Sequence, residues 1–182
     1  MMDKQRTVCF TGHRKMGEPA DVVEARVTEI AEGLIQQGYQ RFCAGGARGF
    51  DALASRVVLQ LREKYPLVQL VLVLPFRNQY RHETGWTEED IAEYHRLKEA
   101  ACEVIHLQQD YSRGCYYRRN CCLVDMASVC VAYQRSHNGG TAYTVRCAAE
   151  QGARSAMPSP AFGPEDSGDN PAAAFFSARI CW

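Results

Sequence analysis

Short apolar runs alternate along the chain with longer stretches in which apolar residues recur every three or four positions. The short runs are typical of buried strands; they are Arg6–Thr11, Gln40–Ala44, Val68–Leu74, Glu103–Leu107 and Ser128–Tyr133. The longer stretches are typical of helices; they are Pro19–Gln37, Phe50–Lys64, Glu88–Ala101, Arg118–Ala127 and Thr141–Gln151. We expect an irregular loop at Tyr111–Tyr117 and a short final strand within Ala153–Pro158.

This alternation predicts an α/β domain: a Rossmann-like, open, mainly parallel sheet with helices on both faces. The domain is expected to span residues 1–158. Pro, Gly, Ser and acidic residues dominate Ser159–Pro171, so residues 159–182 are expected to form a flexible C-terminal tail. The loops after parallel strands share one edge of the sheet, where open α/β folds bind ligands, and functional residues are expected in those loops.

Three post-strand loops carry residues suited to an anion. Thr11–Arg14 combines a glycine, which lets a ligand approach the backbone, with an arginine that can pair a phosphate. Gly45–Asp51 and Asn138–Thr141 are glycine-rich and each opens a helix, where exposed N–H groups and the helix dipole favour negative charge. Asp51 either caps its helix or contacts the ligand.

The common dinucleotide and triphosphate motifs are absent. Gly12–Gly17 does not fit G-x-G-x-x-G, and the second strand ends in Gly45 and Gly46, where a ribose-binding carboxylate is expected. The chain also lacks the G-x-x-x-x-G-K-[ST] loop. An NAD-dependent dehydrogenase of the usual kind is therefore disfavoured.

The amino-acid composition limits the cellular location and the binding partners that we expect for this protein. The 21 Lys and Arg residues balance 21 Asp and Glu residues, so a nucleic-acid partner is not expected. No apolar run is long enough to cross a membrane and no signal-peptide pattern is present, which predicts a cytoplasmic protein without a membrane partner. The nine cysteines lie mostly in apolar runs without ligand spacing, so we expect reduced, buried thiols and no metal site.

The ordered motifs of the chain resemble those of the YpsA-like branch of the SLOG superfamily. They are T-G-H-R, G-G-A-R-G-F-D, P-F with a following Gln and Trp, R-N and G-G-T, between about Thr7 and Gly152. This superfamily includes the DNA-processing protein DprA and the LOG phosphoribohydrolases. The resemblance implies a Rossmann-like fold and a pocket for a nucleotide or an ADP-ribose-like ligand.

The resemblance also implies which residues line that pocket. The implied ligand-binding residues are Gly12, His13, Arg14, Gly45, Gly46, Arg48, Gly49, Asp51, Pro75, Phe76, Gln79, Trp86, Arg119, Asn120, Gly139, Gly140 and Thr141. None of them is assigned a catalytic or metal-binding role.

One departure from the LOG pattern bears on catalysis. LOG enzymes share P-G-G-x-G-T-x-x-E, in which the Glu is an acid/base, whereas this chain has Thr144 at that place. A hydroxyl group cannot do a carboxylate's proton transfer at neutral pH. We therefore expect ligand binding or sensing without catalysis. The alternative is an N-glycosidic hydrolase in which Asp51 takes the place of the missing Glu. A third possibility, a DprA-like binder of single-stranded DNA, needs a basic groove and gets no support from the zero net charge of the chain. A homo-oligomer is left open.

Overall fold

The structure is a computed structural model that describes residues 3–136 and 138–156. Its strands are β1 (Thr7–Gly12), β2 (Arg41–Ala44), β3 (Gln69–Leu74), β4 (Glu103–His106), β5 (Val129–Tyr133) and β6 (Arg154–Ala156). Its α-helices are α1 (Ala20–Gln36), α2 (Phe50–Lys64), α3 (Glu88–Ala100), α4 (Cys115–Met126) and α5 (Gly140–Glu150). Single 3-10 turns lie at Lys4–Arg6 and Gln79–Arg81.

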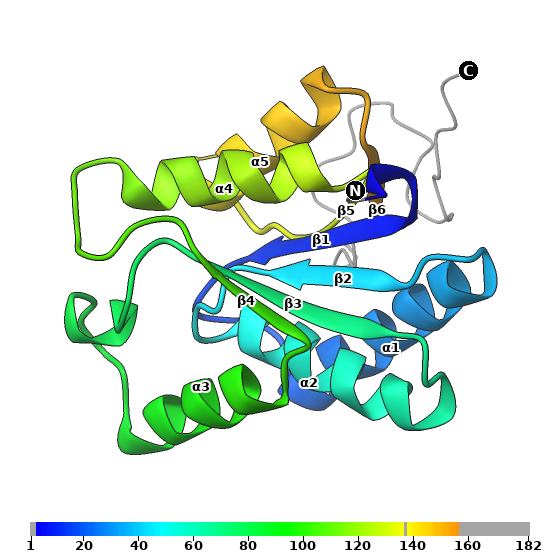
Figure 1. Cartoon of the computed structure of the whole chain (residues 1–182), viewed down its shortest axis with the longest axis horizontal. Helices are drawn as coiled ribbons and strands as arrows, with labels where there is room; N and C mark the ends of the chain where they lie inside the picture. The colour runs from blue at the N-terminus through cyan, green and yellow to red at the C-terminus, as the bar shows by residue number, and fades with distance from the viewer. Residues whose placement is uncertain (1–2, 137, 157–182) are drawn as a thin grey trace, which may run out of the picture.

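In the described part of the chain the strands form one parallel sheet in the order β4-β3-β2-β1-β5-β6. Helices α1, α2 and α3 cover one face, and α4 and α5 cover the other (Figure 1). The predicted Rossmann-like α/β fold is therefore confirmed. The direction of strand addition reverses between β1 and β5, and a crevice forms at such a reversal.

Stacked aromatic rings pack along the sheet and against the start of α2. The Phe10 ring stacks on Phe42 with 6.0 Å between centroids, and the Phe50 ring stacks on Tyr133 at 5.6 Å. Because Phe50 begins α2 and Tyr133 ends β5, their contact fixes the start of that helix beside the strand reversal. Gly12 fits this arrangement, since a Cβ there would lie 2.4 Å from the Phe50 ring.

The opposite face of the sheet buries several thiols. The strand register sets Cys9 beside Cys43 and Cys130. The hydrogen bond to Cys130 and burial raise the pKa of Cys9, and burial raises the pKa of Cys43 to about 12. A raised pKa makes a thiol a weak nucleophile. The described cysteines are free thiols. The predicted burial holds for Cys9, Cys43, Cys115 and Cys130, whereas the remaining described cysteines are half-buried (Cys121, Cys122, Cys147) or exposed (Cys102); Cys181 lies outside the described residues.

The start of α4 corrects one prediction. The segment Tyr111–Tyr117 was expected to be a loop, but α4 begins at Cys115, directly after Gly114 in the left-handed conformation with φ 80°. Aromatic residues are weak helix formers and glycine marks a break, so the local sequence hides this turn. Tertiary packing stabilises it, because Cys115 is buried and Tyr116 packs edge-on against Phe76.

The last described strand lies at the edge of the sheet beside β5. The final strand predicted within Ala153–Pro158 is present as β6. The predicted tail at 159–182 lies outside the described residues. Among those residues, no helix has the length and apolar character needed to cross a membrane.

Candidate functional site

A cavity of about 330 Å³ lies at the carboxyl edge of the sheet, where the strand order reverses. Its walls come from the loop after β1 and from α2, α4 and α5. The lining residues are Phe10, Thr11, Gly12, His13, Arg14, Ala47, Asp51, Tyr116, Arg119, Asn120, Leu123, Gly140 and Thr141. Binding cavities for small molecules have volumes of about 300–1,000 Å³.

The structure brings together some of the residues expected at a ligand site and not others. Those in the cavity lining are Gly12, His13, Arg14, Asp51, Arg119, Asn120, Gly140 and Thr141. Those outside the lining are Gly45, Gly46, Arg48, Gly49, Pro75, Phe76, Gln79, Trp86 and Gly139. The loops after β1 and β5 thus meet at one cavity, whereas the loop after β2 contributes mainly through Asp51.

The loop between β2 and α2 holds a carboxylate of the protein itself. The backbone N–H of Gly45 donates to Oδ2 of Asp51 at 3.2 Å, and the buried amide of Gln79 donates to the Gly46 carbonyl. Gly49 has φ +79°, and a Cβ there would lie 2.3 Å from the Arg14 carbonyl oxygen. The glycines of this loop therefore serve its tight course, and Asp51 satisfies an N–H that a ligand phosphate was expected to meet.

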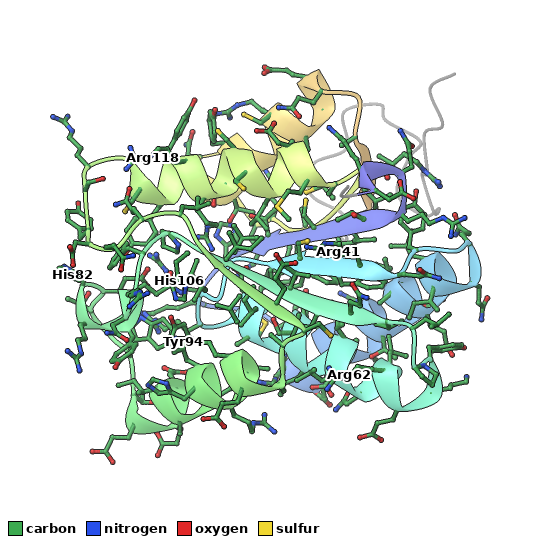
Figure 2. All side chains as sticks on the ribbon, in the orientation of Figure 1. Arg41, Arg62, His82, Tyr94, His106 and Arg118 are labelled. Carbon is green, nitrogen blue, oxygen red and sulfur yellow. The ribbon has the colours of Figure 1, made fainter. Side chains whose placement is uncertain are left out.

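Arg48 and Trp86 lie on a second, much smaller cavity beneath α3. It is also lined by Gly46, Tyr94 and Leu97, and the Tyr94 side chain lies between α3 and the sheet (Figure 2). The Arg48 guanidinium reaches the Thr84 carbonyl oxygen at 3.5 Å instead of the main cavity. Phe76 is fully buried within an aromatic cluster that includes Tyr111 and Tyr116. These positions therefore support the walls of the site and are not part of its lining.

A buried ion pair forms the floor of the main cavity. Nη1 of Arg119 lies 3.5 Å from Oδ2 of Asp51, and the two side chains are 9% and 6% exposed. Burial raises the pKa of Asp51, and the positive charge of Arg119 opposes part of that rise. Gly45 makes room for the pair, since a Cβ there would lie 1.4 Å from Nη1 of Arg119. The buried Nε of Arg119 has no hydrogen-bond partner among the described residues.

The amino end of α5 forms the opposite wall. Its N-cap, Gly139, has φ +92°, and no side chain of the described residues caps the helix. A Cβ at Gly140 would meet only Nδ2 of Asn120, at the ordinary distance of 3.7 Å. The hydroxyl of Thr144 donates to the Gly140 carbonyl oxygen at 2.8 Å and is fully buried. The helix thus presents uncapped N–H groups at the cavity, and no acid/base group stands at position 144.

The loop after β1 carries a neutral histidine and a partly exposed arginine. Nε2 of His13 accepts a hydrogen bond from the Arg135 backbone N–H at 3.0 Å, so neutral His13 holds its proton on Nδ1. Arg14 pairs with Glu83 at 3.0 Å and lies 5.9 Å from the centre of the Tyr116 ring. The cavity rim therefore combines a donor, a cation and an aromatic face.

Tyr116 and Leu123 were not among the predicted site residues. Both line the cavity from α4, together with Arg119 and Asn120. The spacing 116, 119, 120, 123 is the one-face repeat of a helix. The signal was present, but the expected helix began only at residue 118, which left Tyr116 outside the repeat.

His13 is expected to titrate below the ordinary histidine pKa of about 6.5. Burial, followed by the positive charge of Arg135, lowers the pKa of His13. Its contribution to stability is therefore present above the ordinary pKa and is lost as pH falls through the lowered value. NMR of the ring protons measures this pKa. Arg135→Ala is expected to move it upward, whereas Lys64→Ala, at the far end of α2, is expected to leave it unchanged; an upward move with both would contradict the assignment.

Comparisons with known proteins give the chain its relatives. The family model described as the YspA SLOG family matches residues 10–165. UPF0398 protein BH1768 of Halalkalibacterium halodurans is 35% identical over 68 residues, which are 37% of this chain and 34% of that protein. A UPF0398 protein of Bacillus pumilus is 24% identical over 152 residues, which are 78% of this chain and 80% of that protein.

Among solved structures, DNA processing protein A from Helicobacter pylori, studied for its single-stranded DNA binding mode, is similar with a TM-score of 0.60. The identity is 16%, and the match covers 86% of this chain and 66% of that chain. At this identity the likeness shows the fold alone. The chain spans about a third of the first curated relative and just under two thirds of this structural neighbour.

Proposed function

The chain belongs to the YspA SLOG family, and from that premise we propose that its main cavity binds a nucleotide or nucleotide-derived phosphate ligand without converting it. The observation that carries the proposal is the uncapped amino end of α5 at the cavity wall. A helix amino end with free N–H groups and a positive dipole end is a site for a phosphate group. Gly140 allows close approach of an anion because its Cα carries no side chain.

The opposite wall of the cavity offers the complementary chemistry. The Nε of Arg119 is a buried donor without a partner among the described residues, and buried donors of this kind are usually satisfied. Arg119 itself lines the cavity, so its positive charge would favour a phosphate there. The Tyr116 ring in the lining offers an apolar face for a sugar or a base.

Two features support binding without turnover. The Thr144 hydroxyl is engaged by the helix backbone, so it does not face the ligand as an acid or base. The Asp51 carboxylate pairs with Arg119 and accepts a hydrogen bond from the Gly45 N–H, so its Oδ2 is already engaged within the protein. Both features oppose the proton transfer that glycosidic cleavage needs.

Nucleotides are expected to raise the melting temperature of the protein, whereas the matching nucleosides, which lack phosphate, are not. A ligand that binds only the folded state stabilises it, by about 2.7 kcal/mol at 100 times its dissociation constant. A nucleoside lacks the phosphate group proposed to bind the amino end of α5. The measurement is a thermal-shift series over AMP, GMP, CMP, UMP, NAD and ADP-ribose, each against its nucleoside. Equal shifts from nucleosides and nucleotides would contradict a phosphate site.

The second candidate function is hydrolysis of the ligand. It is favoured by the position of Asp51, which lines the cavity and whose carboxyl group has a pKa raised by burial. The samples of the thermal-shift series also test this function. Chromatography detects free base after prolonged incubation. Release of base by the protein, and its disappearance in Asp51→Asn, would replace binding without turnover by N-glycosidic hydrolysis.

Single-stranded DNA is a further candidate partner because DNA processing protein A from Helicobacter pylori, which has this fold, has a single-stranded DNA binding mode. The zero net charge argues against it only on average, since Arg14, Lys15 and Arg135 gather beside the cavity. Fluorescence anisotropy with a labelled 20-nucleotide strand tests this partner. Binding that weakens steeply with salt would support it.

A further inference from the structure

Besides the main cavity and the small one beneath α3, a shallow cavity of about 240 Å³ adjoins the proposed nucleotide site and is called the second cavity below. It is lined by His13, Arg14, Lys15, Arg135 and Ser136. Two of these residues, His13 and Arg14, also line the main cavity. The two cavities therefore share a wall, and one ligand can extend from the first into the second.

The walls of this second cavity are held in place by contacts between two loops. The Arg135 backbone N–H donates to His13, and the Gly17 backbone N–H donates to the Tyr133 hydroxyl at 3.2 Å. The Arg135 guanidinium lies directly over Gly17, where a Cβ would come within 1.7 Å of Nη1. Arg135 is thus positioned by the absence of a side chain at residue 17, so its charge has a defined place.

The charge of this cavity is positive and only partly compensated. Glu83 pairs with Arg14, but Lys15 and Arg135 form no ion pair within residues 3–136 and 138–156. Neighbouring cations repel one another, and a concave site lined by one sign of charge attracts an anion of the opposite sign. His13, kept neutral by its lowered pKa, adds a donor without adding a third unpaired charge.

Described residues between β5 and the start of α5 line both cavities. Arg135 and Ser136 lie just after β5, and the Ser136 hydroxyl accepts a hydrogen bond from the Asn138 backbone N–H at 3.2 Å. Gly140 then opens α5 at the main cavity. An anion in each cavity would therefore contact the same two loops, those after β1 and β5.

From this geometry we infer that the ligand carries at least two phosphate groups, one at the amino end of α5 and one between Lys15 and Arg135. The inference rests on the proposed function, since it extends the same ligand beyond the main cavity. Two successive phosphates occur both in a diphosphate and in the phosphodiester chain of an oligonucleotide. The His13–Arg14 wall suits either, because it lies between the two anion positions.

The test is calorimetric titration with AMP, ADP and the 5′-phosphorylated dinucleotide pApA, and with the corresponding guanine, cytosine and uracil compounds. We expect the best two-phosphate compound to bind about tenfold more tightly than its monophosphate, the effect of one charge-assisted contact. A preference for ADP over pApA identifies a diphosphate, and the reverse preference identifies a phosphodiester chain.

Lys15→Ala and Arg135→Ala are expected to remove most of this tenfold advantage and to leave monophosphate affinity within about twofold. Arg96→Ala, an exposed arginine on α3 outside both cavities, is the matched control and should change neither. Equal affinity for one and two phosphates, with monophosphates bound, would overturn this inference and leave the proposed function standing. Failure of every compound to bind would overturn both. Equal losses of monophosphate and diphosphate binding in the variants would place their charges at the first phosphate and contradict a second position.

Discussion

Gly140→Asp is expected to abolish nucleotide binding without lowering the melting temperature of the free protein. The new carboxylate would lie at the amino end of α5 and occupy the N–H groups proposed for the phosphate. Two like charges 4 Å apart repel by about 4 kcal/mol at an effective dielectric constant of 20, which is about a thousandfold in affinity. Calorimetric titration with the best nucleotide of the thermal-shift series measures the loss.

The fold is expected to tolerate this substitution. Gly140 lies outside the left-handed region, and the nearest atom to an added Cβ is 3.7 Å away. A carboxylate in the first turn of a helix is stabilising by about 0.3–1 kcal/mol. The control is Gly33→Asp on α1, where an added Cβ meets nothing within 4 Å. Gly140→Ala, which adds volume without charge, should weaken binding much less; undiminished binding by Gly140→Asp would place the phosphate elsewhere.

Arg119→Met is expected to destabilise the fold by about 3–5 kcal/mol at pH 7, the usual cost of leaving a buried charge without its partner. The Asp51 carboxylate is only 6% exposed, so solvent cannot replace the lost guanidinium. Methionine keeps much of the volume and apolar length of arginine, which limits the cost from packing alone. Urea denaturation monitored by circular dichroism measures the change.

The pH dependence separates charge from packing in this variant. Without Arg119, the largest effect that opposes burial is lost and the pKa of Asp51 rises further, so the folded state binds a proton more readily than the unfolded state. The free energy of unfolding therefore rises as pH falls from 7 through the folded-state pKa, and the deficit shrinks. The double variant Asp51→Asn, Arg119→Met should recover part of the loss at pH 7. A deficit that is constant with pH and unrelieved in the double variant would mean that packing, not charge, sets the cost.

The two glycine-rich loops show what equal sequence signals can hide. Both follow a strand and open a helix, and both were expected to hold phosphate. In the loop between β2 and α2, the Asp51 carboxylate accepts a hydrogen bond from the Gly45 N–H, so this loop already contains an anion of its own. At α5 the corresponding position, two residues after the N-cap Gly139 as Asp51 is two after the N-cap Gly49, is Thr141. Threonine carries no negative charge, so this loop does not contain an anion of its own. A local pattern could identify both helix starts but could not decide which one faces a ligand.

The amino-acid sequence alone was enough to predict the alternation of strands and helices, the parallel sheet and the edge of the sheet at which the post-strand loops gather. Those features follow from hydrophobic periodicity and from the handedness of crossover connections, which are local or nearly local rules. Contacts between distant residues were decided only by the tertiary structure. The pairing of Asp51 with Arg119, the turn of α4 at Cys115 and the direction of Arg48 depend on neighbours that the chain brings together only on folding. The position of the Arg135 guanidinium over Gly17 also depends on folding. The reason is that burial and charge act through space and not along the sequence.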